Sequence, residues 1–288
     1  MEQLPVPQAD WEQMPSEAEK ADLTALRGGL KGRLAAEFAV LQSSMDALRR
    51  YTQDCGVPGV AAVAGQMLGE MDSRIARIER LADNAAELAV STALRGAQER
   101  RPVEICGYLR ELAACAAEEL AGRGRQIAFA VENTVPPAAD GTQAVWVLAD
   151  RGLMNALLAN LLSNSAAAQG CTRITLQCTA GRSLLYSDNG CGLPPEARAL
   201  LLEGRVDGKV LCAGQTGLLL VREYAQALGW QITLPPVNAI AFVLPAFDGD
   251  AALATAELRS ERRAALDRLR LAQHLRHEFA AMPANSWR

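Results

Sequence analysis

Apolar side chains recur every three or four positions through the first third of the chain, which is the spacing of one face of an α-helix. The first stripe follows Ser16, which has Glu19 three residues later, as in a capping box. We predict one helix from Ser16 to the turn CGVPG at 55–59 and a second helix after that turn. The apolar positions are Leu23, Leu26, Leu30, Leu34, Phe38, Leu41, Met45 and Leu48, then Val60, Val63, Met67, Met71, Ile75, Ile78, Leu81, Ala85 and Leu88.

Two long helices joined by a short turn predict an antiparallel hairpin over residues 16–98. The apolar stripes are wider than one partner helix needs. We therefore expect the hairpin to pair with a second copy in a four-helix bundle, which makes the chain a homodimer through residues 16–98. Residues 1–15 contain prolines and little periodicity, and we expect a flexible lead-in there.

The pattern changes at Arg101-Pro102 to alternating short strands and helices, which continues to about residue 246. Such an alternation predicts helices on one face of a mixed sheet, an α/β sandwich over residues 102–246. For residues 248–288 we predict a C-terminal helical tail that docks on its own protein or on a partner. The whole chain is thus expected to be α+β. The predicted strands are 126–132, 144–148, 173–178, 183–186, 230–234 and 239–244, and the predicted helices are 103–122, 150–170 and 217–228.

Composition narrows the class of protein. Half of the residues are hydrophobic and 22% are charged, as in folded soluble proteins, and the net charge of −4 argues against nucleic-acid binding. No apolar run reaches the roughly 20 residues that span a bilayer, and no secretory signal is visible. The seven cysteines are scattered and form no CxxC pair, which favours reduced thiols. We expect a cytoplasmic protein.

Two asparagines stand on an otherwise apolar helix at 150–170. Asn160 and Asn164 are four residues apart and therefore lie one above the other. A carboxamide on an apolar face needs a polar partner. From this helix alone, two core or cap asparagines with satisfied hydrogen bonds are as good an interpretation as a binding site.

Two glycine-containing motifs follow this helix in order. DNGCG at 188–192 comes after a predicted strand, and GQTG at 214–217 opens a predicted helix. Alone, the first could be a plain turn and the second an ordinary helix start. With the two asparagines, at this order and spacing, they resemble the N, G1 and G2 boxes of the GHKL ATPases with their Bergerat fold. The likeness is greatest to the ATP-binding domain of sensor histidine kinases and covers about residues 102–246.

The resemblance implies an ATP and Mg²⁺ site. Asp188 would accept a hydrogen bond from the exocyclic amine of adenine, while Gly190 and Gly192 would let the backbone approach the nucleotide closely. Asn164 corresponds to the magnesium ligand, for which a neutral oxygen is suitable.

At the phosphate end, the resemblance implies that Gly214 and Gly217 open a helix whose free N–H groups meet phosphate. Residues 201–213 would form the lid, with Arg205 and Lys209 as phosphate contacts. The resemblance places Asn160 at the position where members of the superfamily that hydrolyse ATP have a glutamate as general base. Because an amide cannot take a proton from water, nucleotide binding or transfer to a protein is expected rather than hydrolysis.

The chain also departs from the family. No histidine precedes His274, so the first helix lacks a phosphoacceptor, and no catalytic residue is assigned. Ala213 and Gln215 replace two glycines of the G2 box, and Ala167 replaces the basic residue after the second asparagine. ATP affinity is therefore expected to be weakened or lost. HEFAAMP at 277–283 has a passing likeness to a phosphoacceptor box, but a surface histidine is the better interpretation.

These observations favour a two-component-type signalling protein with a degenerate kinase domain, a pseudokinase that acts through contacts with a response regulator or another signalling protein. The alternative is an active GHKL kinase that phosphorylates a partner in trans. A third hypothesis is a structural module in which DNGCG is only a turn. A lack of Mg-ATP binding would remove the trans-acting kinase. For the structural module, Asp188→Asn should leave every measurable activity unchanged.

Overall fold

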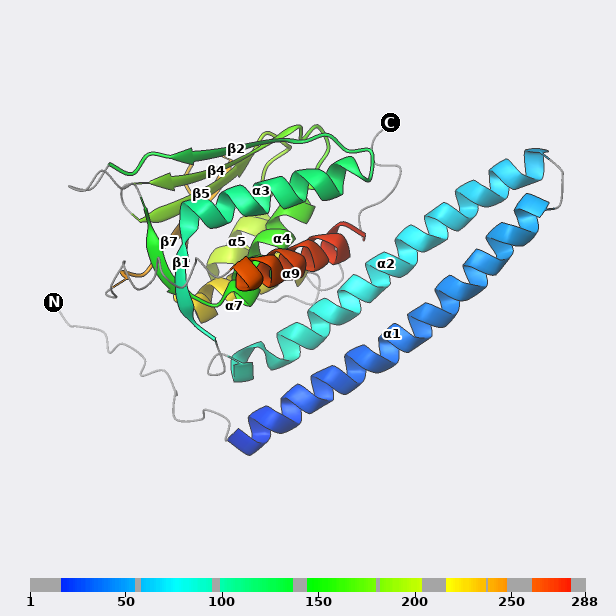
Figure 1. Cartoon of the computed structure of the whole chain (residues 1–288), viewed down its shortest axis with the longest axis horizontal. Coiled ribbons are helices and arrows are strands. Elements are labelled where there is room, and N and C mark those ends of the chain that lie inside the picture. The colour runs from blue at the N-terminus through cyan, green and yellow to red at the C-terminus, as the bar shows by residue number, and fades with distance from the viewer. Residues whose placement is uncertain are drawn as a thin grey trace.

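Two long helices form the N-terminal part of the computed structural model, which describes residues 17–54, 58–94, 99–136, 144–179, 182–203, 216–236, 238–247 and 261–280. Helix α1 (Glu17–Asp54) and helix α2 (Pro58–Leu94) run side by side in opposite directions (Figure 1). Phe38, Met45 and Leu68 are buried between elements, and Arg49 of α1 forms an ion pair with Asp72 of α2 at 2.5 Å.

Both long helices also present large apolar side chains to solvent. We call this set the apolar face of the hairpin. Its ten members are between 37% and 75% exposed, so the packing of α1 on α2 leaves much of the predicted stripes uncovered. They are Val40, Leu41, Leu48, Tyr51, Val60, Val63, Met67, Met71, Ile78 and Leu81.

A five-stranded sheet in the order β2-β4-β5-β7-β6 forms the second part of the molecule. Strands β2 and β4 are parallel, and the other neighbours are antiparallel. Two further strands, β1 (Arg101–Glu104) and β3 (Trp146–Ala149), pair with each other. The strands of the larger sheet are β2 (Ala128–Asn133), β4 (Arg173–Thr179), β5 (Ser183–Asp188), β6 (Gln231–Thr233) and β7 (Ala239–Val243).

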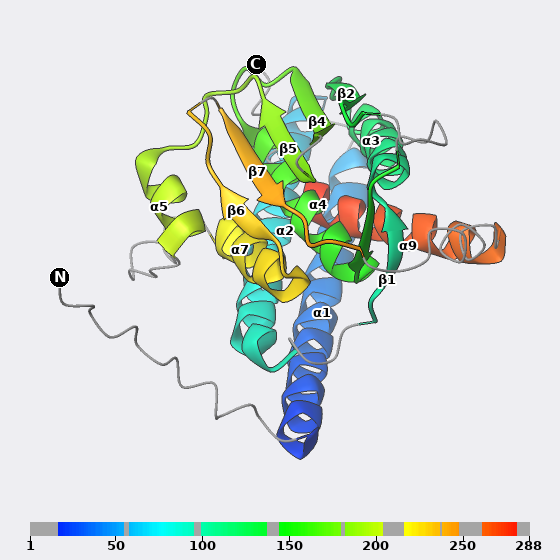
Figure 2. The ribbon, with the colours of Figure 1, turned by 90° about the vertical axis from the view of Figure 1, so that its left-hand side faces the viewer.

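Helices cover one face of this sheet (Figures 1 and 2). Alternate residues of the strands point into the core, for example Ile174 and Leu176 of β4 and Phe242 of β7, all fully buried. This alternation is the pattern of a sheet with one buried face. The expected α+β class is confirmed. The helices of this part are α3 (Ile105–Ala121), α4 (Arg151–Ala167), α5 (Pro195–Glu203) and α7 (Thr216–Leu228).

Helix α4 begins at a side-chain cap. Asp150 accepts hydrogen bonds from the backbone N–H groups of Gly152 and Leu153 at 2.8 and 3.2 Å, which satisfies two donors that the first helical turn leaves free. The buried face of α4 then packs on the sheet and on α7. This cap fixes the position of both asparagines in the fold.

The C-terminal helix α9 (Glu261–Ala280) packs on α3 and α4 and also contacts α2. Its inner face is Leu271, Leu275 and Phe279, which are fully buried. In Figure 1, α9 lies between the helical layer of the sandwich and α2. Among the described helices, none combines the length and apolar character that crossing a bilayer requires.

Candidate functional site

A cavity of about 220 Å³ opens at the carboxyl end of β5, between that strand, α4, α7 and the loop that follows Asp188. Its walls are mostly apolar, with a few polar groups at one side, as is typical of small-molecule sites. The lining residues are Leu161, Asn164, Ser165, Ala168, Tyr186, Ser187, Asp188, Cys191, Gly192, Leu193, Pro194, Ala197, Leu218, Asn238, Ala239 and Ile240.

Four groups hold the Asp188 carboxylate in place. The Ser165 hydroxyl donates to Oδ2 at 2.5 Å, while the Gly190 N–H and Asn238 Nδ2 donate to Oδ1 at 2.8 and 3.2 Å. The Tyr186 hydroxyl donates in turn to Ser165 Oγ at 2.8 Å. Hydrogen bonds to both oxygens fix the orientation of the carboxylate.

Burial controls the protonation of the side chains behind this carboxylate. It raises the pKa of Tyr186 well above its usual value, so this phenol remains a donor to Ser165. Burial also raises the pKa of Cys171, and the nearby Asp188 charge adds to that rise, so the thiol stays protonated. At this end of the cavity, the side-chain oxygens of Asp188 can accept a further hydrogen bond from a ligand N–H.

Two glycines shape the loop after Asp188. A Cβ on Gly190 would lie 3.0 Å from Asp188 Oδ1 and 3.1 Å from the Ala168 Cβ, so a side chain there would press on the carboxylate. Gly192 has φ of +82°, a left-handed conformation that glycine adopts without strain. The loop geometry thus depends on glycine at both positions.

Asn160 and Asn164 of α4 lie in different surroundings. Asn164 is half-buried and lines the cavity with Asp188. Asn160 is only 2% exposed; its Nδ2 donates to the Ala156 carbonyl at 2.9 Å, and its Oδ1 has no hydrogen-bond partner among the described residues. The structure therefore brings Asn164, Asp188 and Gly192 together and places Asn160 one turn away.

Asn160 instead lines a second cavity, of about 400 Å³, where α2, α4, α7 and α9 meet. Gly217, in the first turn of α7, packs closely against Asn160. A Cβ on Gly217 would lie 2.7 Å from Asn160 Oδ1. The remaining lining residues of this cavity are Asp83, Asn84, Glu87, Gly152, Leu153, Ala156, Tyr224, Gln273, His274, His277 and Glu278.

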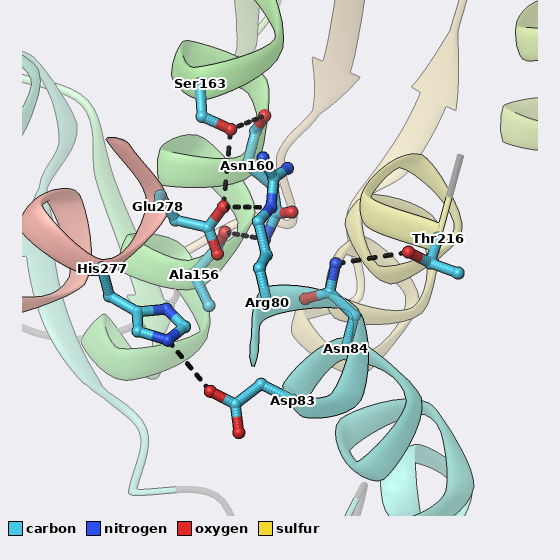
Figure 3. A network of polar contacts seen from close by, with 9 residues as sticks. All are labelled: Arg80, Asp83, Asn84, Ala156, Asn160, Ser163, Thr216, His277 and Glu278. Carbon is cyan, nitrogen blue, oxygen red and sulfur yellow. Dashed lines mark hydrogen bonds and ion pairs between the residues drawn. The ribbon is translucent and has the colours of Figure 1, made fainter. Parts of the chain in front are cut away.

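A polar network crosses the second cavity and joins four helices (Figure 3). Arg80 of α2 forms an ion pair with Glu278 of α9 at 3.0 Å. The neighbouring His277 forms one with Asp83 at 2.9 Å, and this bond raises the pKa of His277 although burial opposes the rise. Two hydrogen bonds of 3.4 Å complete the network, from Ser163 to Glu278 and from Asn84 to Thr216.

Several predicted site residues lie outside the described part of the chain, namely Lys209, Gly214, Arg205 and the G2-box substitutions Ala213 and Gln215. The predicted lid at 201–213 begins inside α5, whose last residues are 201–203. We had expected no helix there. Helix α5 begins at Pro195. This start is physically reasonable, because proline is favoured in the first turn of a helix.

Sequence reasoning missed Ser165 and Asn238, which orient Asp188, and the whole network around Arg80. Ser165 follows Asn164 directly and could have been found from its place in the motif. Arg80 and Glu278 carry no local signal, since their pairing depends on how distant helices meet. Among the described residues, no three histidine, cysteine, aspartate or glutamate side chains form a metal site.

No protein-family model and no curated protein matches the chain. Solved structures that it resembles include full-length ShkA in complex with AMPPNP, with a TM-score of 0.43 and 20% identity over 75% of this chain and 47% of that one. The mycobacterial sensor histidine kinase MprB gives a TM-score of 0.36 and 25% identity, over 51% of this chain and 97% of that one.

The blue-light activated histidine kinase of Erythrobacter litoralis EL346 gives a TM-score of 0.33 and 17% identity, over 65% of this chain and 62% of that one. The chain thus spans about half the length of the ShkA structure. MprB and the EL346 protein are histidine kinases, and the likeness concerns the fold.

Proposed function

We propose that this chain is a two-component-type signalling protein whose sandwich binds an adenine nucleotide, and that it acts through protein contacts without phosphorylating itself. The observation that carries the proposal is the Asp188 carboxylate, oriented by three donors at one side of an otherwise apolar cavity. Adenine fits this arrangement, because a planar apolar ring with one exocyclic amine needs apolar walls and one acceptor.

Magnesium fits the same site through Asn164. Mg²⁺ is commonly held by one or two protein oxygens together with phosphate oxygens and water, so it needs no cluster of carboxylates. When bound, a magnesium nucleotide would supply phosphate chemistry, while Asp188 and Asn164 bind and orient it. The bound state of the ShkA structure, with AMPPNP, is in keeping with this proposal.

The lack of self-phosphorylation follows from the sequence. The chain has only two histidines, and neither lies in α1 or α2. Asn160, at the place of a hydrolytic base, is an amide that donates to a backbone carbonyl. Neither the acceptor of a phosphoryl group nor a base for water is supplied by these positions.

The three parts of the chain have separate tasks in this proposal. Residues 16–98 hold two copies together as a homodimer, residues 102–246 bind the nucleotide, and the tail at 248–288 links the two parts through α9. A response regulator or another signalling protein docks on the assembled dimer. The exposed apolar face of the hairpin supports the homodimer, since a patch of this kind marks an interaction surface.

Nucleotide binding is tested by calorimetric titration with Mg-ATP. Asp188→Asn should lower the affinity by about tenfold or more, because the amide replaces an acceptor that the adenine amine needs. Asn164→Ala should weaken Mg-ATP but leave adenosine unaffected, since adenosine carries no metal. Glu118→Gln, an exposed change on α3, is the matched control and should leave both affinities as they are.

Incubation with labelled ATP tests the second half of the proposal. No label should appear on the purified chain. Label on any residue of α1 would contradict the absence of self-phosphorylation, and label on an added partner protein would favour the alternative of a kinase that acts in trans. Titrations that detect neither ATP nor adenosine would leave the structural-module hypothesis.

A further inference from the structure

Arg80 reaches from the hairpin into the interior of the junction between the hairpin and the sandwich. Its side chain is 17% exposed, and its Nε lies 3.0 Å from Glu278 Oε2, whose side chain is 10% exposed. The Ser163 hydroxyl donates to the same oxygen at 3.4 Å. Figure 3 shows the guanidinium beside Glu278 and in front of Asn160. A buried pair of this kind requires both charges, because either one alone would be left uncompensated.

The guanidinium also lies against the first turn of α7. A Cβ on Gly217 would be 3.2 Å from Arg80 Nη2, and Asn84 of the same turn of α2 donates to the Thr216 hydroxyl. The N-terminus of a helix carries a partial positive charge. A guanidinium and a helix N-terminus in contact are therefore two positive groups that together attract an anion. In this structure the anion beside them is the Glu278 carboxylate.

Asn160 gives an independent indication that a ligand binds beside Arg80 and the first turn of α7. Its Oδ1 is buried, has no hydrogen-bond partner among the described residues, and lies 2.7 Å from the Cβ position of Gly217. A buried acceptor without a donor costs free energy. An amide oxygen beside an anion site can accept a hydrogen bond from a guanidinium that has turned or from a water, and it can coordinate a hard cation that accompanies phosphate.

The place and the Asp188 cavity are neighbours along both α4 and α7. Asn164 and Leu218 line that cavity, while Asn160 is one turn earlier on α4, about 6 Å along the axis, and Gly217 precedes Leu218. A ligand with its base at Asp188 that extends past Asn164 would thus bring its phosphates to Gly217 and Arg80.

We propose that Arg80 and the first turn of α7 form the anion site for the phosphates of the nucleotide, and that Glu278 of α9 is an internal competitor for this site. The inference rests on the proposed function. Arg80 supplies from the hairpin a cation that binds phosphate with a planar pair of N–H donors. As phosphate binds Arg80, the guanidinium leaves Glu278, and α9 loses one of its two ion pairs with α2.

Titrations with Mg-ATP and with adenosine on the full chain test the proposal. Glu278→Gln should raise the affinity for Mg-ATP by about tenfold, the scale of one charge-assisted contact, because the competing charge is gone. Arg80→Gln should lower it by a similar factor. Neither change should alter the affinity for adenosine, since the Asp188 end is untouched.

Arg276→Gln is the matched control. Arg276 also belongs to α9 and forms an ion pair, at 2.7 Å with Glu119, but on the side of α3. This variant loosens α9 without touching Arg80 and should leave the Mg-ATP affinity unchanged. A thermal unfolding curve for each variant confirms that it is folded.

Two results would overturn the inference but not the proposed function. In the first, adenosine binds but the Mg-ATP affinity is the same in all variants. In the second, Arg276→Gln raises the Mg-ATP affinity as much as Glu278→Gln does. Failure of adenosine to bind to any folded variant would overturn the proposed function, and this inference with it. The two failures are thereby distinguished.

Discussion

Gly217 shows how closely single atoms are packed where α7 meets α4 and α2. Alanine at this position would place its Cβ 2.7 Å from Asn160 Oδ1 and 3.2 Å from Arg80 Nη2. One of these two buried groups must then move. We predict that Gly217→Ala destabilises the fold by about 1–3 kcal/mol, the usual cost of overpacking.

The measurement is urea unfolding followed by circular dichroism, with Gly65→Ala as the control. Gly65 lies on the exposed side of α2, and a Cβ there meets nothing within 4 Å. Alanine should stabilise α2 at this position by up to about 1 kcal/mol through its helix propensity. Equal stability changes in the two variants would contradict the packing described for Gly217.

At the scale of residues, the sequence motifs located the polar end of the Asp188 cavity but not its supports. Asn164, Asp188 and Gly192 were predicted together because box spacing is a local property of the chain. Asn238 comes from a distant segment and meets Asp188 only once the sheet has formed. Contacts of this kind have no periodicity or spacing that a single sequence could reveal.

At the scale of elements, α9 binds the hairpin through two consecutive residues. His277 pairs with Asp83, and Glu278 pairs with Arg80, while Leu275 and Phe279 are buried beside Glu278 on the same helix. The tail pattern predicted a docked helix but not its inner face. Leu266 and Leu269 of the same helix are also apolar, yet they are 50% and 51% exposed. Periodicity alone does not tell which of several leucine stripes meets a neighbour.

The His277–Asp83 pair makes this contact dependent on pH. The pKa of His277 is raised by its hydrogen bond to Asp83 and by the charges of Asp83, Glu278 and Glu79, against the effect of burial. Because the folded pKa lies above the unfolded value of about 6.5, the stabilisation is fully present below that pH. It is lost as the pH rises through the folded pKa.

We therefore expect wild type to be more stable than His277→Gln at pH 6, and the difference to shrink toward pH 8.5. The pair is partly exposed, so the difference should be at most about 1 kcal/mol, or a few degrees in Tm. Thermal unfolding across this pH range measures it. A difference that grows with pH would show that the protonated histidine does not stabilise α9 on α2.

At the scale of the whole molecule, the apolar face of the hairpin is the surface on which the proposed homodimer depends. We predict that wild type sediments as a dimer and that Met67→Asp with Met71→Asp shifts it toward monomer, because two charges would be buried in the interface. Both side chains are more than half exposed in the single chain, so the fold itself should persist.

Analytical ultracentrifugation measures the shift, with unchanged helical content by circular dichroism as the check on folding. Glu70→Gln, on the same helix, serves as the control and should remain dimeric. A monomeric wild type, or a dimer that survives the double change, would contradict the proposed interface.

Helix α2 has one apolar, exposed surface and one polar surface that contacts the sandwich. Ile78 and Leu81 belong to the apolar face, whereas Arg80, Asp83 and Asn84 point into the sandwich junction. Since these residues share two turns of one helix, a rotation of α2 in the proposed homodimer by one residue position, about 100°, would withdraw all three polar side chains at once. A signal received at the proposed dimer interface would then reach the proposed nucleotide site through the rotation of this one helix.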